Sequence, residues 1–256
     1  MGMMRIAVVS DIHANLPALK AVLRDIRQQG AEEIYCLGDL VGYGPNPREV
    51  VDLAMKWFRF TLRGNHDEAV TYKIPKHFNK IAARSVFWTR SVMKPAPGAS
   101  IRAIKRWTFL RKKLEDVVQI DDLMFAHGTP TSFYDYIDSI ESAKKVFAAL
   151  PEGVTTLFVG HSHVPMVFVE APEGIRILNY DSPKLPRLRE FRMIINVGSV
   201  GQPRDGDPRA CYVMVDTDEN LFWYRRVEYD VEETVRMIYA RVGLPKDNAH
   251  RLRGGY

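Results

Sequence analysis

Five short motifs contain most of the side chains in this sequence that could bind a cation or transfer a proton. The motifs are Asp11-Ile12-His13, Gly38-Asp39, Gly64-Asn65-His66-Asp67, His127-Gly128 and Gly160-His161-Ser162-His163. Five of the seven histidines lie in these motifs, and only His77 and His250 lie elsewhere. Such a concentration is poorly explained by chance or by a structural role for each histidine.

The ligand types in these motifs indicate which cations they would hold. Imidazole, carboxylate and one amide oxygen, without thiolate, suit Mn, Fe, Zn, Co or Ni better than Ca or a structural zinc. Seven ligands are too many for one ion with an open position, but they suit two ions that share a carboxylate. Two ions about 3.5–4 Å apart clamp a phosphoryl group and activate a bridging water near neutral pH. We therefore expect two divalent metal ions as cofactors.

Each motif follows an apolar run that is typical of a β-strand. These runs are Ile6–Ser10, Ile34–Leu37, Phe60–Leu62, Leu123–Ala126 and Thr155–Val159. In α/β sheets, ligands collect at the carboxyl ends of the strands, so we expect the motifs to meet in one cleft. In Asp-x-His and His-x-His, an extended backbone would place both side chains on the same side, within reach of one ion.

The segments between these runs show helical periodicity, which predicts an α/β architecture. Helices are expected after Asn15, after Asn46, within residues 78–113, after a capping box of Asp138 and Glu141, and after Asp230. The runs Val117–Ile120 and Leu123–Ala126 predict a hairpin, and residues 167–227 are mostly β in pattern. We expect a single domain over residues 1–256, with a loose polar tail after about residue 243.

The composition, 46% hydrophobic and 26% charged, is ordinary for a soluble globular protein. No run is long enough for a membrane span or a signal peptide, and two cysteines give no disulfide framework, so we expect a cytoplasmic protein without membrane partners. A net charge of +5 mildly favours an anionic partner.

The basic stretch from Arg102 to Lys113 could contact nucleic acid, but a solvated helical face is the favoured interpretation.

Taken together and in order, the five motifs resemble the signature of the calcineurin-like metallophosphoesterases. The downstream segment Asn196-Val197-Gly198-Ser199-Val200-Gly201-Gln202-Pro203 is similar to that of small prokaryotic phosphodiesterase-type members. The resemblance thus covers most of the chain. It implies a four-layer α/β/β/α sandwich with two facing mixed sheets, the metallophosphoesterase fold.

The resemblance also implies a role for each motif residue. Asp11, His13 and His163 would hold one metal, and Asn65, His127 and His161 would hold the other. Asp39 would bridge the two ions. His66 would lie just outside the metals as the general acid for the leaving oxygen, with Asp67 orienting its imidazole. An unligated histidine titrates near neutrality, which suits this role.

The second motif departs from that of phosphoprotein phosphatases and symmetrical diadenosine tetraphosphate hydrolases, which commonly continue as Gly-Asp-x-Val-Asp-Arg-Gly. Here Gly42 and Tyr43 replace the aspartate and the arginine, and a tyrosine hydroxyl cannot copy a bidentate guanidinium clamp. This favours a phosphodiester substrate. Candidate substrate contacts are Asn15, Tyr43, Arg63 and Arg204, each of which could equally stabilise its loop, and Tyr134 and Tyr136 could line the cleft.

We therefore expect hydrolysis of a phosphoester, most simply a small or nucleotide-derived phosphodiester, by a metal-bridging hydroxide with His66 as general acid. A phosphomonoesterase or phosphoprotein phosphatase, a dinucleoside tetraphosphate hydrolase and a nuclease using the basic stretch are enzymatic alternatives. A catalytically silent scaffold is the alternative from another class. The intact triplet Asn65-His66-Asp67 argues against it, because a silent site has no need of an unligated acid.

Overall fold

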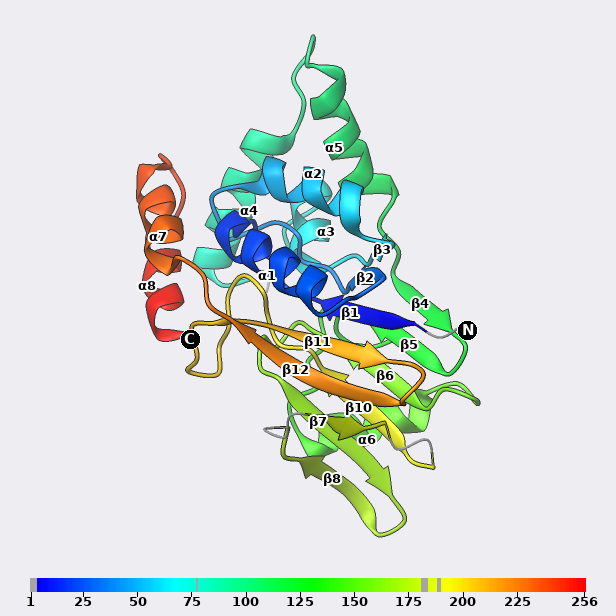
Figure 1. Ribbon diagram of the computed structural model, residues 1–256. Helices are drawn as coiled ribbons and strands as arrows, with labels where there is room; N and C mark the ends of the chain where they lie inside the picture. The colour runs from blue at the N-terminus through cyan, green and yellow to red at the C-terminus, as the bar shows by residue number, and fades with distance from the viewer. Residues whose placement is uncertain (1–3, 77, 181–183, 188–189) are drawn as a thin grey trace.

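Two six-stranded sheets lie face to face in the computed structural model, which describes residues 4–76, 78–180, 184–187 and 190–256 (Figure 1). The first has the order β3-β2-β1-β11-β12-β9, and the second has the order β4-β5-β6-β10-β7-β8. Strands of the first sheet are β1 (Arg5–Val9), β2 (Glu33–Cys36), β3 (Phe60–Thr61), β9 (Leu185–Pro186), β11 (Ala210–Asp216) and β12 (Leu221–Val227). Strands of the second are β4 (Val117–Ile120), β5 (Leu123–Ala126), β6 (Thr156–Val159), β7 (Met166–Ala171), β8 (Gly174–Leu178) and β10 (Arg192–Asn196).

Both sheets are mixed, and the strands that precede the motifs form their parallel parts. β2 is parallel to β1 and β3, and β6 is parallel to β5 and β10. The remaining pairs are antiparallel, including the predicted hairpin of β4 and β5. β1 lies between β2 and β11, so Ile6 is opposite Val215, near the other end of the chain.

Successive side chains of the central strands point to opposite faces of the sheet and so contribute to two different hydrophobic cores. Ile6 and Val8 of β1 face the space between the sheets, where they join Phe125 and Phe158. Neighbouring residues Ala7 and Val9 face the helices α1 (Leu16–Gln28) and α2 (Pro47–Trp57), which cover the first sheet. On the second sheet, residues of β5 and β6 pack against α6 (Ile140–Ala149). This pattern confirms the expected α/β/β/α layers (Figure 1).

Phe125 is the side chain whose loss should most damage the core between the sheets. It is fully buried, with its ring centroid 5.3 Å from that of Phe158, and 5.2 Å from that of Tyr35. We expect Phe125→Ala to lower the free energy of unfolding by about 3–5 kcal/mol, measured by urea denaturation. Phe87→Ala is the matched control, since Phe87 is 67% exposed and its truncation should cost less than about 0.5 kcal/mol. Equal losses in the two variants would contradict this assignment of the core.

Three further helices lie beside the first sheet and include the basic stretch. They are α3 (Asn65–Thr71), α4 (Lys80–Met93) and α5 (Ile101–Lys112). On α5, Arg106 donates to Asp52 through Nε (2.8 Å), and Arg102 also pairs with Asp52. Trp107 of the same helix packs against the core. These contacts give Arg102, Arg106 and Trp107 a structural role. Lys105, Arg111, Lys112 and Lys113 are exposed, as a solvated helical face would be.

Two sequence predictions about helix ends are wrong. The N-cap of α6 is Ser139, which exchanges hydrogen bonds with Ser142 in place of the expected pair of Asp138 and Glu141. Instead of a loose tail, the residues after Gly243 include α8 (Asp247–Gly254), which packs on α7 (Val231–Ala240). Its inner face is buried because Leu252 contacts an apolar cluster and the Asn248 amide donates to Tyr43 O (2.8 Å).

The described helices also bear on the membrane question. None of them, α1 to α8, combines the length with the hydropathy that crossing a membrane requires.

Candidate metal centre

The five motif loops leave the carboxyl ends of β1, β2, β3, β5 and β6, and they converge as expected. Their backbone, however, is not extended, so that prediction is wrong. Positive φ angles, between 47° and 65°, occur at Asp11, His13, Asp39, His161 and His163. This left-handed conformation is uncommon for residues with side chains, and such strain concentrates at functional sites. Backbone bonds between loops hold it, for example from His13 N to Asp39 O (2.9 Å).

Asp39 lies between imidazoles from two different sheets. Its Oδ2 is 3.5 Å from Nε2 of His13 and 3.6 Å from Nε2 of His127. On the His13 side, Asp11 Oδ1 is 3.2 Å from Nε2 of His163. All five side chains are at most 2% exposed. The structure therefore brings these sequence-predicted residues into one buried cluster.

Hydrogen bonds to backbone carbonyls fix the tautomer of three histidines. Nδ1 lies 3.2 Å from Val41 O in His13, 3.0 Å from Leu37 O in His127, and 2.6 Å from Gln202 O in His163. Because a carbonyl oxygen only accepts, each Nδ1 carries the hydrogen, and the Nε2 lone pair of the neutral ring points into the cluster. Metal-binding histidines are held by the same kind of bond. In His161 the arrangement is reversed, since Nε2 faces Tyr134 O (3.1 Å).

Lone pairs therefore face one another at two places. The Nε2 atoms of His13 and His163 are 3.1 Å apart, and Nε2 of His127 is 3.1 Å from Asn65 Oδ1. Asp11 Oδ1 is buried without a hydrogen-bond partner among the described atoms. A cation between the members of each pair would turn this repulsion into attraction, so the donor set fits two divalent ions.

Burial sets the charge of these groups. Loss of solvent lowers the pKa of His127 below its ordinary value, and lowers the pKa of His161 and of His163 to about 3, so the rings are neutral ligands at pH 7. Burial, followed by repulsion from Asp67 and Asp11, raises the pKa of Asp39 well above its usual range. Positive charge at the centre would stabilise the ionised form of this carboxylate.

His66 lies beside the cluster, and its surroundings differ from the expectation. Asp67 does not bond to its imidazole: the Asp67 carboxylate accepts from the backbone N–H groups of Leu40 (3.3 Å), Val41 (3.2 Å) and Gly64 (3.2 Å). His66 Nδ1 is buried without a partner among the described atoms, and it packs against Gly42, where any Cβ would clash with it. Asp67 thus joins two motif loops and does not orient His66.

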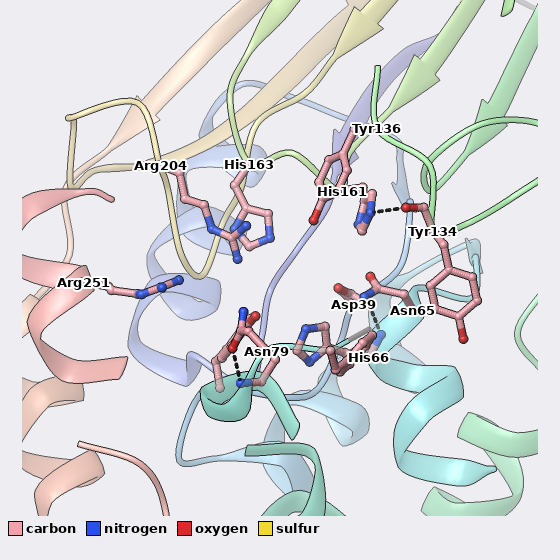
Figure 2. A pocket seen from close by; sticks show the side chains of 13 residues that line it. Asp39, Asn65, His66, Asn79, Tyr134, Tyr136, His161, His163, Arg204 and Arg251 are labelled. Atoms are coloured by element: carbon pink, nitrogen blue, oxygen red, sulfur yellow. Dashed lines mark hydrogen bonds between the residues drawn. The ribbon is translucent and has the colours of Figure 1, made fainter. Parts of the chain in front are cut away.

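A cavity of about 200 Å³ opens onto the cluster (Figure 2). Its wall includes Tyr43 and Arg204, two of the predicted substrate contacts, together with Tyr134 and Tyr136. Tyr136 stacks on His161, with ring centroids 4.0 Å apart. The wall is completed by residues from α4 and α8 and from the loop before α4, with Phe78, Asn79, Ala82 and Arg251 among them.

Two predicted substrate contacts serve the fold instead. Asn15 caps α1 by accepting from Ala18 N (3.3 Å), and its amide donates to Gly201 O (2.9 Å). Arg63 pairs with Glu68 and Asp116. Conversely, Asn79 and Arg251 are absent from the sequence predictions. Asn79 caps α4, and its place before a helical pattern could have identified it as an N-cap from the sequence. Arg251 falls in the segment that was expected to be loose.

The four layers, with buried Asp and His residues gathered at the strand ends, define a metallophosphoesterase. The sequence profile of the calcineurin-like phosphoesterase superfamily domain matches residues 4–220, and the chain belongs to this superfamily of hydrolases acting on phosphoester bonds. A crystal structure of a metallophosphoesterase from Sphaerobacter thermophilus is 34% identical and superposes with a TM-score of 0.84 over 100% of both chains.

Two other proteins are similar over nearly the whole chain. An uncharacterized protein of Methanocaldococcus jannaschii is 36% identical over 255 residues, which is 96% of each sequence. A hypothetical protein of Pyrococcus horikoshii shares the fold, with 19% identity and a TM-score of 0.75 over 98% of both chains. Both matches extend beyond the residues that the superfamily profile covers.

Proposed function

We propose that this chain hydrolyses phosphodiesters with two divalent metal ions. Asp11, His13 and His163 would hold one ion, Asn65, His127 and His161 would hold the other, and both ions would share Asp39. The observation that carries the proposal is the two buried sets of facing lone pairs on either side of one carboxylate. When bound, the ions supply Lewis acidity to the phosphoryl oxygens and a nucleophile from water.

The chain's own residues position the substrate and move one proton. Arg204 lies on the cavity wall near the His13 side of the cluster, where its guanidinium contacts a phosphoryl oxygen. His66 donates a proton to the leaving oxygen. Burial, followed by the proximity of the His13 imidazole and the Arg204 guanidinium, lowers the pKa of His66 well below its usual value. The negative charge of a bound phosphate acts against this lowering of the His66 pKa.

The cavity wall supports a diester over a monoester. A diester has an organic group on each side of phosphorus, and Phe78, Tyr134 and Tyr136 offer rings against which a second group can pack. The replacement of an arginine by Tyr43 is a weaker argument than the sequence suggested, because Arg204 reaches the same cavity from another loop, with its guanidinium carbon 5.9 Å from the centroid of the Tyr43 ring.

Metal content and two chromogenic substrates test the proposal. Metal-stripped protein reconstituted with manganese should bind about two ions per chain and hydrolyse bis-p-nitrophenyl phosphate faster than p-nitrophenyl phosphate. Faster monoester turnover would contradict the diester preference in favour of a phosphomonoesterase. Two bound ions without turnover of either substrate would favour a scaffold. Protein that binds no manganese would contradict the metal centre itself.

A further inference from the structure

Two guanidinium groups line the same cavity as the Asp39 carboxylate, and neither is paired directly with a carboxylate of the described residues. Neither Arg204 nor Arg251 forms an ion pair within the described parts of the chain. Arg204 donates from Nη2 to the neutral Gln202 Oε1 (3.0 Å), while its Nε is buried and has no partner among the described atoms. No side-chain hydrogen bond joins Arg251 to any described residue. A guanidinium has five donors. Arg204 uses donors on Gln202 and Tyr136 but keeps others, and the side-chain donors of Arg251 remain available for an anion.

The two arginines belong to different parts of the cavity wall. The backbone N–H of Arg204 donates to the carbonyl oxygen of His163, a motif residue (3.2 Å), whereas Arg251 lies on α8. Burial raises the pKa of Tyr43, and both guanidinium groups oppose this, so Tyr43 lies within reach of both. Figure 2 shows Arg251 across the cavity from Asp39 and Asn65.

Arg251 is held at this place by the packing of α8. From the same helix, Asn248 Nδ2 donates to Tyr43 O (2.8 Å) and to Ser85 Oγ (3.0 Å). Leu252 packs with Trp88 and Ile238, and Arg253 on the outer face pairs with Glu232 of α7. The backbone that carries Arg251 is therefore fixed on both sides, while its side chain remains directed to the cavity (Figure 2).

We propose that Arg251 binds a second phosphate group of the substrate, several bonds away from the scissile phosphorus. This inference rests on the proposed function, with the scissile phosphate at the metals and Arg204. Two like charges on one cavity wall repel each other, and a substrate with two separated anionic groups satisfies both. The substrate class is thus a phosphodiester that carries an additional phosphate, such as a phosphorylated nucleotide ester.

A pair of substrates that differ only in the remote group tests this subsite. Thymidine 5′-(p-nitrophenyl phosphate) and its 3′-phosphorylated form present the same scissile bond. For the wild type, we expect kcat/KM to be at least about tenfold higher with the 3′-phosphate, chiefly through a lower KM. Arg251→Gln should abolish this preference, and Arg251→Lys should restore part of it. Arg253→Gln, on the exposed face of the same helix, should retain it in full.

Each failure has a distinct meaning. Equal kcat/KM of the wild type for the two esters would overturn the subsite, as would an Arg251→Gln variant that keeps the preference. If neither ester, nor bis-p-nitrophenyl phosphate, is hydrolysed by manganese-loaded wild type, the proposed function itself fails. Loss of the preference in the Arg253→Gln variant would show that the effect comes from the packing of α8 and would overturn the direct contact.

Discussion

Asparagine in place of Asp39 is expected to remove metal from both sites at once and to lower manganese-dependent turnover by about 10³-fold or more. The Asp39 carboxylate approaches His13 and His127, and its charge is the one that two ions would share. An amide has one acceptor oxygen and no charge, so it cannot bridge. The remaining oxygen can still accept from His66 N, as Asp39 Oδ1 does now (2.8 Å), so the loop should keep its shape.

Elemental analysis of the Asp39→Asn variant after manganese reconstitution is the measurement. Asp52→Asn is the matched control, because Asp52 also carries hydrogen bonds, but to Arg102 and Arg106 on α5. The control should keep about two ions and wild-type turnover. An Asp39→Asn variant that binds both ions would show that this carboxylate does not bridge them.

Asparagine in place of His66 should have a different signature, in which both metals remain and the loss depends on the leaving group. For an ester with an alkoxide leaving group, we expect kcat to fall by about 10²–10⁴-fold, because the departing oxygen needs a proton. For a p-nitrophenyl ester the fall should be much smaller, since p-nitrophenolate leaves as a stable anion. The comparison uses two diesters that differ in the leaving group. Methyl p-nitrophenyl phosphate releases p-nitrophenolate, and dimethyl phosphate releases an alkoxide.

Metal analysis separates this role from ligation. His66 lies near enough to His13 and Asp39 that these three side chains alone could surround a cation. Loss of an ion from the His66→Asn variant, together with an equal loss of turnover for both leaving groups, would therefore identify His66 as a ligand. Retention of both ions with a leaving-group-dependent loss would identify it as the acid.

Local patterns were sufficient to predict most of the scaffold and the convergence of the motifs. An apolar run followed by a polar motif specifies both a buried strand and the edge at which its ligands emerge, as at β1 and Asp11. The hairpin of β4 and β5 forms without glycine, because Asp121 adopts the left-handed conformation (φ 53°) that an aspartate tolerates in a turn. Asn15 and Asp230 cap their helices as predicted.

Features that depend on contacts between distant loops could not be predicted in this way. The bonds from Leu40 and Val41 to Asp67 join two motifs, whereas the family resemblance implied that this carboxylate orients the adjacent His66. Likewise, the polar sequence after Gly243 concealed an inner face, which only the positions of Trp88 and Tyr43 define. Arg251 was missed for that reason.

The place of β1 between β2 and β11 has a consequence for synthesis of the protein. A ribosome must add the chain as far as Ala210, of 256 residues, before β11 begins to exist. Until then, the N–H and C=O groups along one side of β1 have no partner strand, and its apolar residues are not fully enclosed. An unpaired apolar edge is a template for joining another chain. β1 is thus enclosed long after it has been synthesised, and it is a segment that a chaperone has reason to cover during translation.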